Sequence, residues 1–153
     1  METLLLASGL FLLIRYFTNS RGSTMANSQV DAINESKLSG VKPVLREKVL
    51  KIVELAKKQG TILVVVYGRR SYAEQKKLYD QGRTKPGNII TYKKPGTSKH
   101  EFGDAADICF WVNGKPSYAE SNDWNLIGRL AKQVGLKWGG NWKNFKDRPH
   151  VEL

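Results

Sequence analysis

"GTILVVVYGRRSYAE", residues 60–74, joins a predicted strand to a predicted helix. Its β-branched run lies between two glycines, which is typical of a strand buried inside a sheet. Ser71 and Glu74 have the spacing of a capping box, so a helix should begin just after the strand and end at Gly82. This immediate passage from strand to helix indicates a domain that mixes both element types.

The residues on either side of this stretch predict a helix and a loop. Before it, residues 43–59 repeat apolar positions at helical spacing and stop before Gly60. After it, residues 83–99 carry two Pro-Gly turns and many cations, which predicts a long ordered surface loop.

The second half of the chain predicts two strands and a helix. A strand should occupy residues 106–112, followed by a hairpin turn at Asn113 and Gly114. A helix should occupy residues 122–133, and residues 147–153 should form a short extended segment. We therefore expect an α+β fold in which helices pack on a small, mostly antiparallel sheet.

Composition places limits on the partners. The chain has 153 residues, enough for one domain with a real core, and a formal net charge of +11. That charge favours a polyanion such as a nucleic acid, a membrane surface or a cell-wall polymer. The sequence contains no zinc-finger, RNP-like or leucine-zipper motif, so we expect no nucleic-acid partner, and we expect a monomer. The single cysteine, Cys109, excludes an intramolecular disulfide and a multi-cysteine metal site.

Residues 1–24 differ from the rest of the chain. Residues 4–14 are almost wholly apolar, but the run is short for a membrane-spanning helix, which needs about 20 residues. It fits a signal peptide poorly, because arginines follow the apolar run instead of preceding it. The segment is therefore signal-like or anchor-like, with membrane contact through residues 4–17, or it is an upstream extension of a protein that starts at Met25. We expect a single domain over residues 25–153.

The chain has two histidines, His100 and His150, and both are candidate metal ligands. A catalytic zinc commonly takes three protein ligands from histidine and carboxylate and leaves a fourth position open. His100, Asp107 and His150 would complete such a set, and the small residues between the first two, such as Gly103, should leave room for an ion. Alternatively, His100 lies in a polar turn, Asp107 begins a strand and His150 is a surface side chain. Spacing alone leaves both interpretations open.

Four stretches resemble a known family. "SKHEFGDAADI", residues 98–108, resembles the S-x-H-x-x-G-x-A-x-D-[IL] motif of the D-Ala-D-Ala carboxypeptidase/VanY-like zinc peptidases. "DRPHVEL", residues 147–153, resembles their D-x-P-H-[FV]-E segment. Residues 70–91 and 135–153 are similar to the L-alanyl-D-glutamate endopeptidase branch, which includes phage endolysins. The resemblance begins near residue 39 and does not include residues 1–24.

The resemblance implies roles for the residues of the two motifs. His100, Asp107 and His150 would be the ligands of a zinc site in a cleft at the sheet, and they are the same trio that the residue types select. Asp147 would be the general base, which takes a proton from the attacking water and passes it to the leaving amine. The alternative for Asp147 is a surface aspartate paired with a neighbouring cation. Glu152 should share the face of His150 on a strand, which makes it a rival base or a partner that orients the ligand.

Residues near the predicted capped helix receive substrate roles from the same resemblance. Arg70 would stabilise an oxyanion or hold a substrate carboxylate. Arg69 stands where the family usually has an aromatic or small residue, so either arginine can point into the cleft, although Arg70 aligns better. Ser98 and Gln75 would orient a ligand or substrate. Each also has a structural alternative, a turn for Ser98 and a tie between loop and helix for Gln75.

Several other residues are expected to be structural. The four tryptophans should line the core or the cleft, and Cys109 should be a buried apolar residue. Glu101 and Asp104, the other acids of the first motif, should face solvent.

The expected function is that of a zinc-dependent peptidoglycan peptidase that hydrolyses the L-Ala-D-Glu bond of the murein stem peptide, as a phage-type endolysin does in cell lysis. Two alternatives stay open: a D-Ala carboxypeptidase of the same fold, and a non-catalytic, zinc-containing cell-wall binding module. The site of action would be the bacterial cell wall, whose anionic polymers the net charge should attract. Before lysis the protein would be membrane-associated or cytoplasmic.

Overall fold

The computed structural model describes residues 27–153, so predictions about residues 1–24 lie outside the described part. The division of the chain at residue 25 stays a prediction. Residues 27–37 are helical, and the named elements follow in this order: α2 (Pro43–Lys58), β1 (Leu63–Tyr67), α3 (Tyr72–Asp80), β2 (Ala105–Val112), β3 (Lys115–Ser117), α4 (Trp124–Gln133), β4 (Lys137–Trp138), the 3-10 turn η1 (Gly139–Asn141) and β5 (His150–Glu152). No helix in the described part is long and apolar enough to cross a membrane.

The strands form one sheet in the order β1-β2-β5-β4, with β3 paired to β2 away from this path. Every strand pairing in it is antiparallel. β5 lies inside the sheet, between β2 and β4, although it comes last in sequence order. The predicted α+β class with a mostly antiparallel sheet is confirmed.

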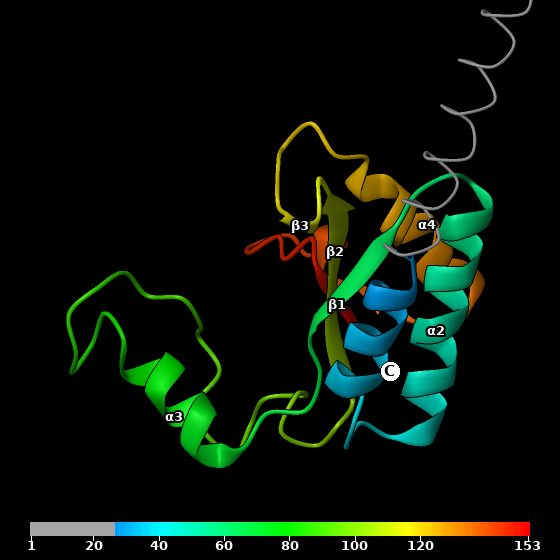
Figure 1. Ribbon diagram of the computed structural model, residues 1–153. Helices are drawn as coiled ribbons and strands as arrows, with labels where there is room; N and C mark the ends of the chain where they lie inside the picture. The colour runs from blue at the N-terminus through cyan, green and yellow to red at the C-terminus, as the bar shows by residue number, and fades with distance from the viewer. Residues whose placement is uncertain (1–26) are drawn as a thin grey trace, which may run out of the picture.

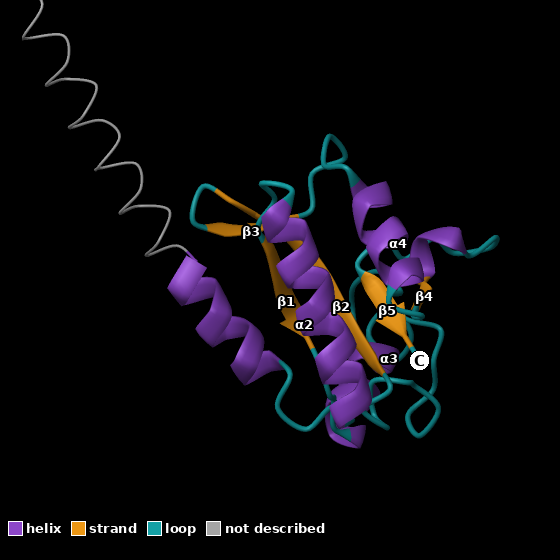
Figure 2. Cartoon of the chain, turned by 90° about the vertical axis from the view of Figure 1, so that its right-hand side faces the viewer, coloured by secondary structure: helices purple, strands orange, loops and turns teal. Residues whose placement is uncertain are grey.

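Helices cover one face of this sheet, and a separate lobe lies on the other side (Figures 1 and 2). The helical segment 27–37 and α2 lie side by side on the covered face, and α2 also contacts α4. The core between helices and sheet is made of fully buried aliphatic side chains, among them Leu45, Val49, Ile52, Leu63, Val64, Ile108 and Ile127. Helix α3 and the loop after it project from the body as what we call the α3 lobe.

Helix α3 begins at its predicted capping box. The Ser71 hydroxyl accepts a hydrogen bond from the Glu74 backbone N–H, and the Glu74 carboxylate accepts one from the Ser71 backbone N–H at 2.7 Å. The buried residue of α3 is polar: Gln75 has no exposed surface. The α3 lobe is therefore attached through hydrogen bonds as much as through apolar packing.

The other predicted elements also occur, with boundaries that differ by one to three residues. The helix predicted over residues 43–59 ends at Lys58, and the one predicted over residues 122–133 begins at Trp124. Asn113 and Gly114 both have positive φ, 52° and 77°, as a two-residue type I′ hairpin turn requires. The loop over residues 83–99 carries no helix or ladder strand, as expected.

Candidate metal centre

Two neighbouring strands and one turn bring the predicted ligands together. Asp107 on β2 lies directly opposite His150 on β5 in the antiparallel register. Opposed residues on adjacent strands project from the same face, with Cβ atoms about 5 Å apart. His100 comes from the turn that precedes β2, where its carbonyl accepts the backbone N–H of Arg70 at 3.1 Å. The sheet register thus sets one pair, and the turn adds the third side chain.

The three side chains meet through one atom each. His100 Nε2 lies 3.3 Å from Asp107 Oδ1, and His150 Nδ1 lies 3.2 Å from the same oxygen. The two imidazole nitrogens are 3.3 Å apart. The ligand atoms of these three side chains all lie within 4.8 Å of one another, close enough to hold one metal ion. The structure therefore brings together the predicted trio.

Hydrogen bonds on the outer side of both histidines determine which ring nitrogen carries the proton. His100 Nδ1 donates to the backbone carbonyl of Gly68 at 2.8 Å, and His150 Nε2 lies 3.3 Å from the Glu152 carboxylate, which can only accept. The inward nitrogens of neutral His100 and His150 are then lone-pair acceptors, and Asp107 adds a third. Three acceptors facing one another require a cation between them, so the donor set fits a metal ion.

The charges within this cluster reinforce one another. Burial opposes charge on Asp107, yet the adjoining imidazoles of His100 and His150 hold the pKa of its carboxyl well below the usual range. Burial also opposes charge on His150, but the Asp107 carboxylate raises the pKa of the imidazole above its usual value. Asp107 is therefore ionised at neutral pH, as a metal ligand must be.

Backbone packing fixes the turn that carries His100. A Cβ on Gly68 would lie 2.0 Å from the Lys37 carbonyl oxygen, so only glycine allows the carbonyl that orients His100 to sit there. Gly103 has φ of +70°, and a Cβ there would lie 3.1 Å from the Gly40 oxygen. Gly103 therefore lets the chain between His100 and Asp107 turn tightly against residues 40–42.

Asp147 lies next to the cluster and lines the same cleft. Its backbone N–H donates to Gly139 at 3.0 Å, and its carbonyl accepts the N–H of His150 at 3.2 Å. A Cβ on Gly139 would lie 2.4 Å from the backbone carbonyl oxygen of Asp147 and 3.0 Å from the Cβ of His150, so only glycine fits there. Burial, followed by the negative charge of Asp107, raises the pKa of the Asp147 carboxyl above its ordinary value. The structure thus places Asp147 beside the ligands and not on the free surface.

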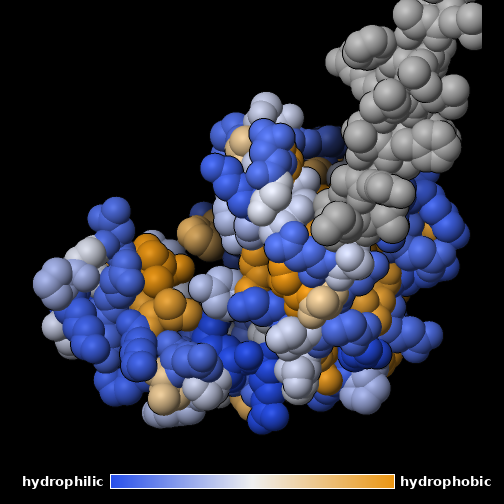
Figure 3. All heavy atoms as spheres, in the orientation of Figure 1, coloured by the Kyte–Doolittle hydropathy of each residue, from blue (hydrophilic) through white to orange (hydrophobic). Residues whose placement is uncertain are grey.

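The cleft has a volume of about 440 Å³ and runs between the body and the α3 lobe. Figure 3 shows a hollow there, with apolar side chains on the inner flank of the lobe. Trp142 packs its ring 5.0 Å from that of His150, and Tyr92 of the lobe meets Phe145 edge-on at 5.9 Å. Sequence reasoning missed Tyr67, Tyr92 and Phe145 as cleft residues, because nothing in their local spacing distinguishes them from surface aromatics.

Arg70 is the arginine that reaches the cleft. Its guanidinium lies 5.5 Å from the centre of the Tyr67 ring, and its Nη1 donates to Gln75 Oε1 at 2.8 Å. Arg69 is exposed and runs along Gly40 on the other side of the strand end. Gln75 also donates to the Lys93 carbonyl at 2.8 Å, so it both orients Arg70 and ties the loop to the helix.

Two acids of the first motif are not solvent-facing, and that expectation was wrong. Glu101 accepts backbone N–H groups of Gly96 and Ser98, at 2.9 and 3.1 Å, and thereby caps the turn. Asp104 is only 14% exposed and pairs with Lys42 at 2.7 Å. Ser98 is buried and lines the cleft. Glu152 contacts the outer nitrogen of His150, the geometry of an orienting partner.

Comparison with known proteins gives the same relationship over most of the chain. A family model described as D-alanyl-D-alanine carboxypeptidase matches residues 92–153. The chain is 37% identical over 130 residues to the peptidoglycan L-alanyl-D-glutamate endopeptidase CwlK of Bacillus subtilis, covering 75% of this chain and 74% of that protein. It is 28% identical over 137 residues to the L-alanyl-D-glutamate peptidase of Escherichia phage T5, covering 78% of this chain and 93% of that protein.

A solved structure agrees with the fold. The L-Ala D-Glu endopeptidase ChiX of Serratia marcescens superposes with a TM-score of 0.55 at 27% identity, covering 80% of this chain and 86% of that chain. The match to the family model includes both motifs that carry the candidate metal centre. The chain therefore belongs to the D-Ala-D-Ala carboxypeptidase (VanY-like) peptidase family and, within it, to the L-alanyl-D-glutamate endopeptidase branch.

Proposed function

We propose that the protein is a zinc-dependent endopeptidase that hydrolyses the L-Ala-D-Glu bond of the murein stem peptide. The observation that supports this most strongly is the inward-facing acceptor set of His100, Asp107 and His150, with Asp147 in the same cleft. The choice of bond is supported by two relatives, CwlK and the phage enzyme, which are both named as L-alanyl-D-glutamate peptidases.

We propose zinc as the metal because two imidazoles and one carboxylate, with a position left open, are the common ligands of catalytic zinc. Zinc held there supplies a Lewis acid that polarises the amide carbonyl and makes a water molecule acidic. The Gly68 carbonyl and the Glu152 carboxylate keep the inward nitrogens of the histidines free of protons. We assign Glu152 to that orienting role instead of the role of base.

Asp147 is the proposed general base. Its carboxylate takes the proton of the attacking water and delivers it to the amine that leaves as the amide bond breaks. Arg70 lines the same cleft, where its guanidinium stabilises negative charge on the carbonyl oxygen or holds a substrate carboxylate. The buried Gln75 amide limits the orientations open to Arg70 and thereby pre-organises the site. Ser98, on the cleft wall, is a proposed substrate contact.

The experiment is mass analysis of purified peptidoglycan after digestion, with and without a chelator. Fragments with a new D-Glu amino terminus are expected, their formation should stop with chelator, and added zinc should restore it. Release of D-Ala alone would instead identify a carboxypeptidase, the activity that the family model describes. Wall binding without any product would favour a binding module.

The proposed place of action is the bacterial cell wall, and we propose a phage-type role in lysis, which the phage T5 relative supports. Expression together with a membrane-permeabilising protein should lyse the host, whereas expression alone should not. Mapping the mature amino terminus by mass spectrometry would test whether residues 1–24 remain on the protein.

A further inference from the structure

A second cavity shares one wall residue, Asp147, with the main cleft. It has a volume of about 340 Å³, and its walls include Tyr118, Trp124, Lys146 and Arg148. Asp147 lines both cavities, so the proposed base stands at their junction. A substrate whose scissile bond reaches Asp147 can therefore extend in two directions.

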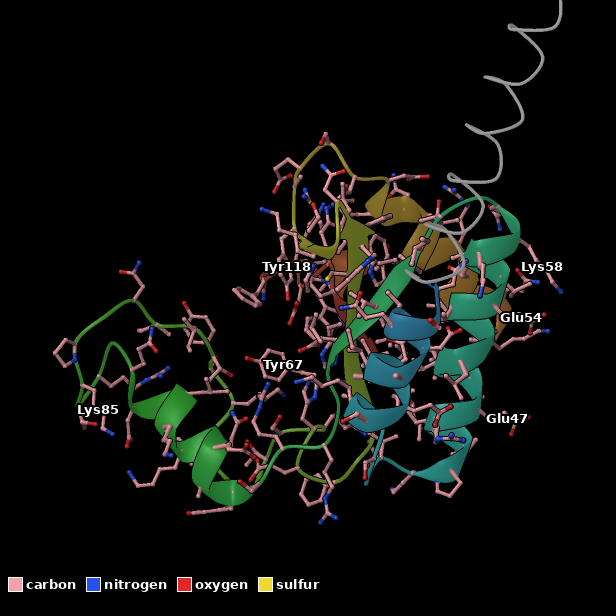
Figure 4. All side chains as sticks on the ribbon, in the orientation of Figure 1. Glu47, Glu54, Lys58, Tyr67, Lys85 and Tyr118 are labelled. Carbon is pink, nitrogen blue, oxygen red and sulfur yellow. The ribbon has the colours of Figure 1, made fainter. Side chains whose placement is uncertain are left out.

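Tyr118 lies on the wall of the second cavity. Burial and the neighbouring Cys109, Asp107 and Tyr67 together raise the pKa of its phenol to about 12. The ring is nevertheless 53% exposed. Figure 4 shows Tyr118 and Tyr67 on the side of the body that faces the α3 lobe. Tyr67 lines the main cleft and Tyr118 lines the second cavity, so both cavities open on the same side of the body.

The charges of the two cavities differ. The main cleft contains Arg70, Lys93 and Lys99, which suit the half of the substrate that carries carboxylates. In the proposed reaction that half begins with D-Glu, on the amine side of the scissile bond. In the second cavity Arg148 is paired with Glu120. Lys146 and the exposed ring of Tyr118 therefore remain to contact a substrate there. This surface suits a largely neutral group with C–H faces.

We propose that the second cavity binds the acyl half of the substrate, L-alanine and the amino sugar to which it is attached, with the sugar ring stacked on Tyr118. This inference rests on the proposed cleavage of the L-Ala-D-Glu bond and adds a glycan subsite to it. The protein then recognises its substrate on both sides of the bond, as a glycan-linked peptide instead of a free one.

The wall of this subsite is held rigidly. The Trp124 indole donates to the Ala119 carbonyl at 3.1 Å, and the Asn122 amide donates to the Ser117 carbonyl at 3.2 Å. Trp124 also packs edge-on against Phe110 at 5.2 Å. The loop that presents Tyr118 is thus pre-organised, which lowers the entropic cost of ligand binding.

The test compares two substrates that differ only in the sugar: a disaccharide-linked tetrapeptide and the same tetrapeptide with an acetyl group in place of the sugar. Tyr118→Ala should raise KM for the disaccharide substrate by about fivefold to tenfold, the value of a lost ring contact. Its KM for the acetyl peptide should not change. Tyr118→Phe should keep the preference, because the ring remains. Tyr72→Ala, which removes another exposed tyrosine outside both cavities, is the matched control.

The outcomes separate this inference from the proposed function. Equal losses on both substrates would mean that Tyr118 acts through the metal centre, and unchanged kinetics would mean that the sugar does not bind there; either result overturns the subsite. If the unmodified protein cleaves neither substrate, the proposed function itself fails. Thermal unfolding of each variant checks that the fold is retained.

Discussion

Asp147, the proposed general base, is a partly buried carboxyl group. A base must be ionised, yet burial and the Asp107 charge raise the pKa of the Asp147 carboxyl. Its proton affinity is thereby brought closer to that of a water molecule activated for attack, which improves proton transfer. As a consequence, acidification should abolish activity at a higher pH than it would with an ordinary aspartate as the base.

Asp147→Asn should lower kcat by about 10²- to 10⁴-fold and leave the metal content unchanged, because the amide cannot take a proton. In the parent protein, the rate should fall as pH drops through the raised pKa, above the ordinary value of about 3.9. Steady-state kinetics against pH, with metal content measured at each pH, would check this. Asp123→Asn, at an exposed aspartate paired with Arg129 at 3.0 Å, is the control. Full activity of Asp147→Asn would transfer the role to Glu152 or refute the mechanism.

Single residues also show where sequence reasoning succeeds and fails. The trio of His100, Asp107 and His150 could be predicted because the chain has only two histidines and because both motifs resemble a known family, whereas spacing alone left two interpretations open. The prediction for Glu101 was wrong because its partners are backbone N–H groups. Every residue except proline has such a group, so the sequence does not show which of them a side chain will bind. Asp104 was misjudged because Lys42 lies in a distant segment that only the fold brings close.

Helix α3 is the element that supports the substrate side of the cleft, because it carries Gln75 at its second turn. Its cap is electrostatic as well as geometric. Hydrogen bonds from Ser71 lower the pKa of Glu74, so the folded state prefers the ionised carboxyl. A lowered folded pKa contributes stability above the unfolded pKa of about 4.3 and loses it as pH falls through the folded value.

Glu74→Gln should therefore lower the unfolding temperature at pH 7 and have a smaller effect once the pH falls below the lowered pKa of the parent carboxyl, where that carboxyl is also neutral. Ser71→Ala removes the hydroxyl of the cap and should cost about 1 kcal/mol at either pH. Thermal and denaturant unfolding would measure both. Glu47→Gln, at an exposed position of α2, is a suitable control. An equal effect of Glu74→Gln at both pH values would contradict the ionised cap.

At the level of elements, the predictions with strong local signals were accurate. The capping box, the Asn-Gly turn and the apolar periodicity of α2 each depend on neighbouring residues, so local chemistry decides them. The position of β5 between β2 and β4 could not be predicted. Strand order depends on pairing between distant segments, and β5 contains only three residues.

The whole molecule carries a formal charge of +11, which should govern its attachment to the wall more than its chemistry. Salt screens exposed charges, and the Debye length shrinks from about 10 Å at 0.1 M to about 3 Å at 1 M. Binding to isolated cell walls should therefore weaken steeply with added salt.

The Asp147→Asn variant, which should bind without cutting, allows this to be measured by co-sedimentation with walls at low and high salt. Cleavage of a small stem peptide by the parent protein should change far less over the same range, since it needs no long-range attraction. Wall binding that is insensitive to salt would show that shape or hydrogen bonding, and not net charge, holds the protein on its substrate.

The position of β5 inside the sheet also has a consequence for biosynthesis. His150 is the last of the three proposed ligands to leave the ribosome, and its strand must enter between β2 and β4, which precede it. A nascent chain that has exposed His100 and Asp107 therefore still lacks the third donor. The order of translation alone keeps the proposed hydrolase inert until residue 150 has emerged and the sheet has closed around it.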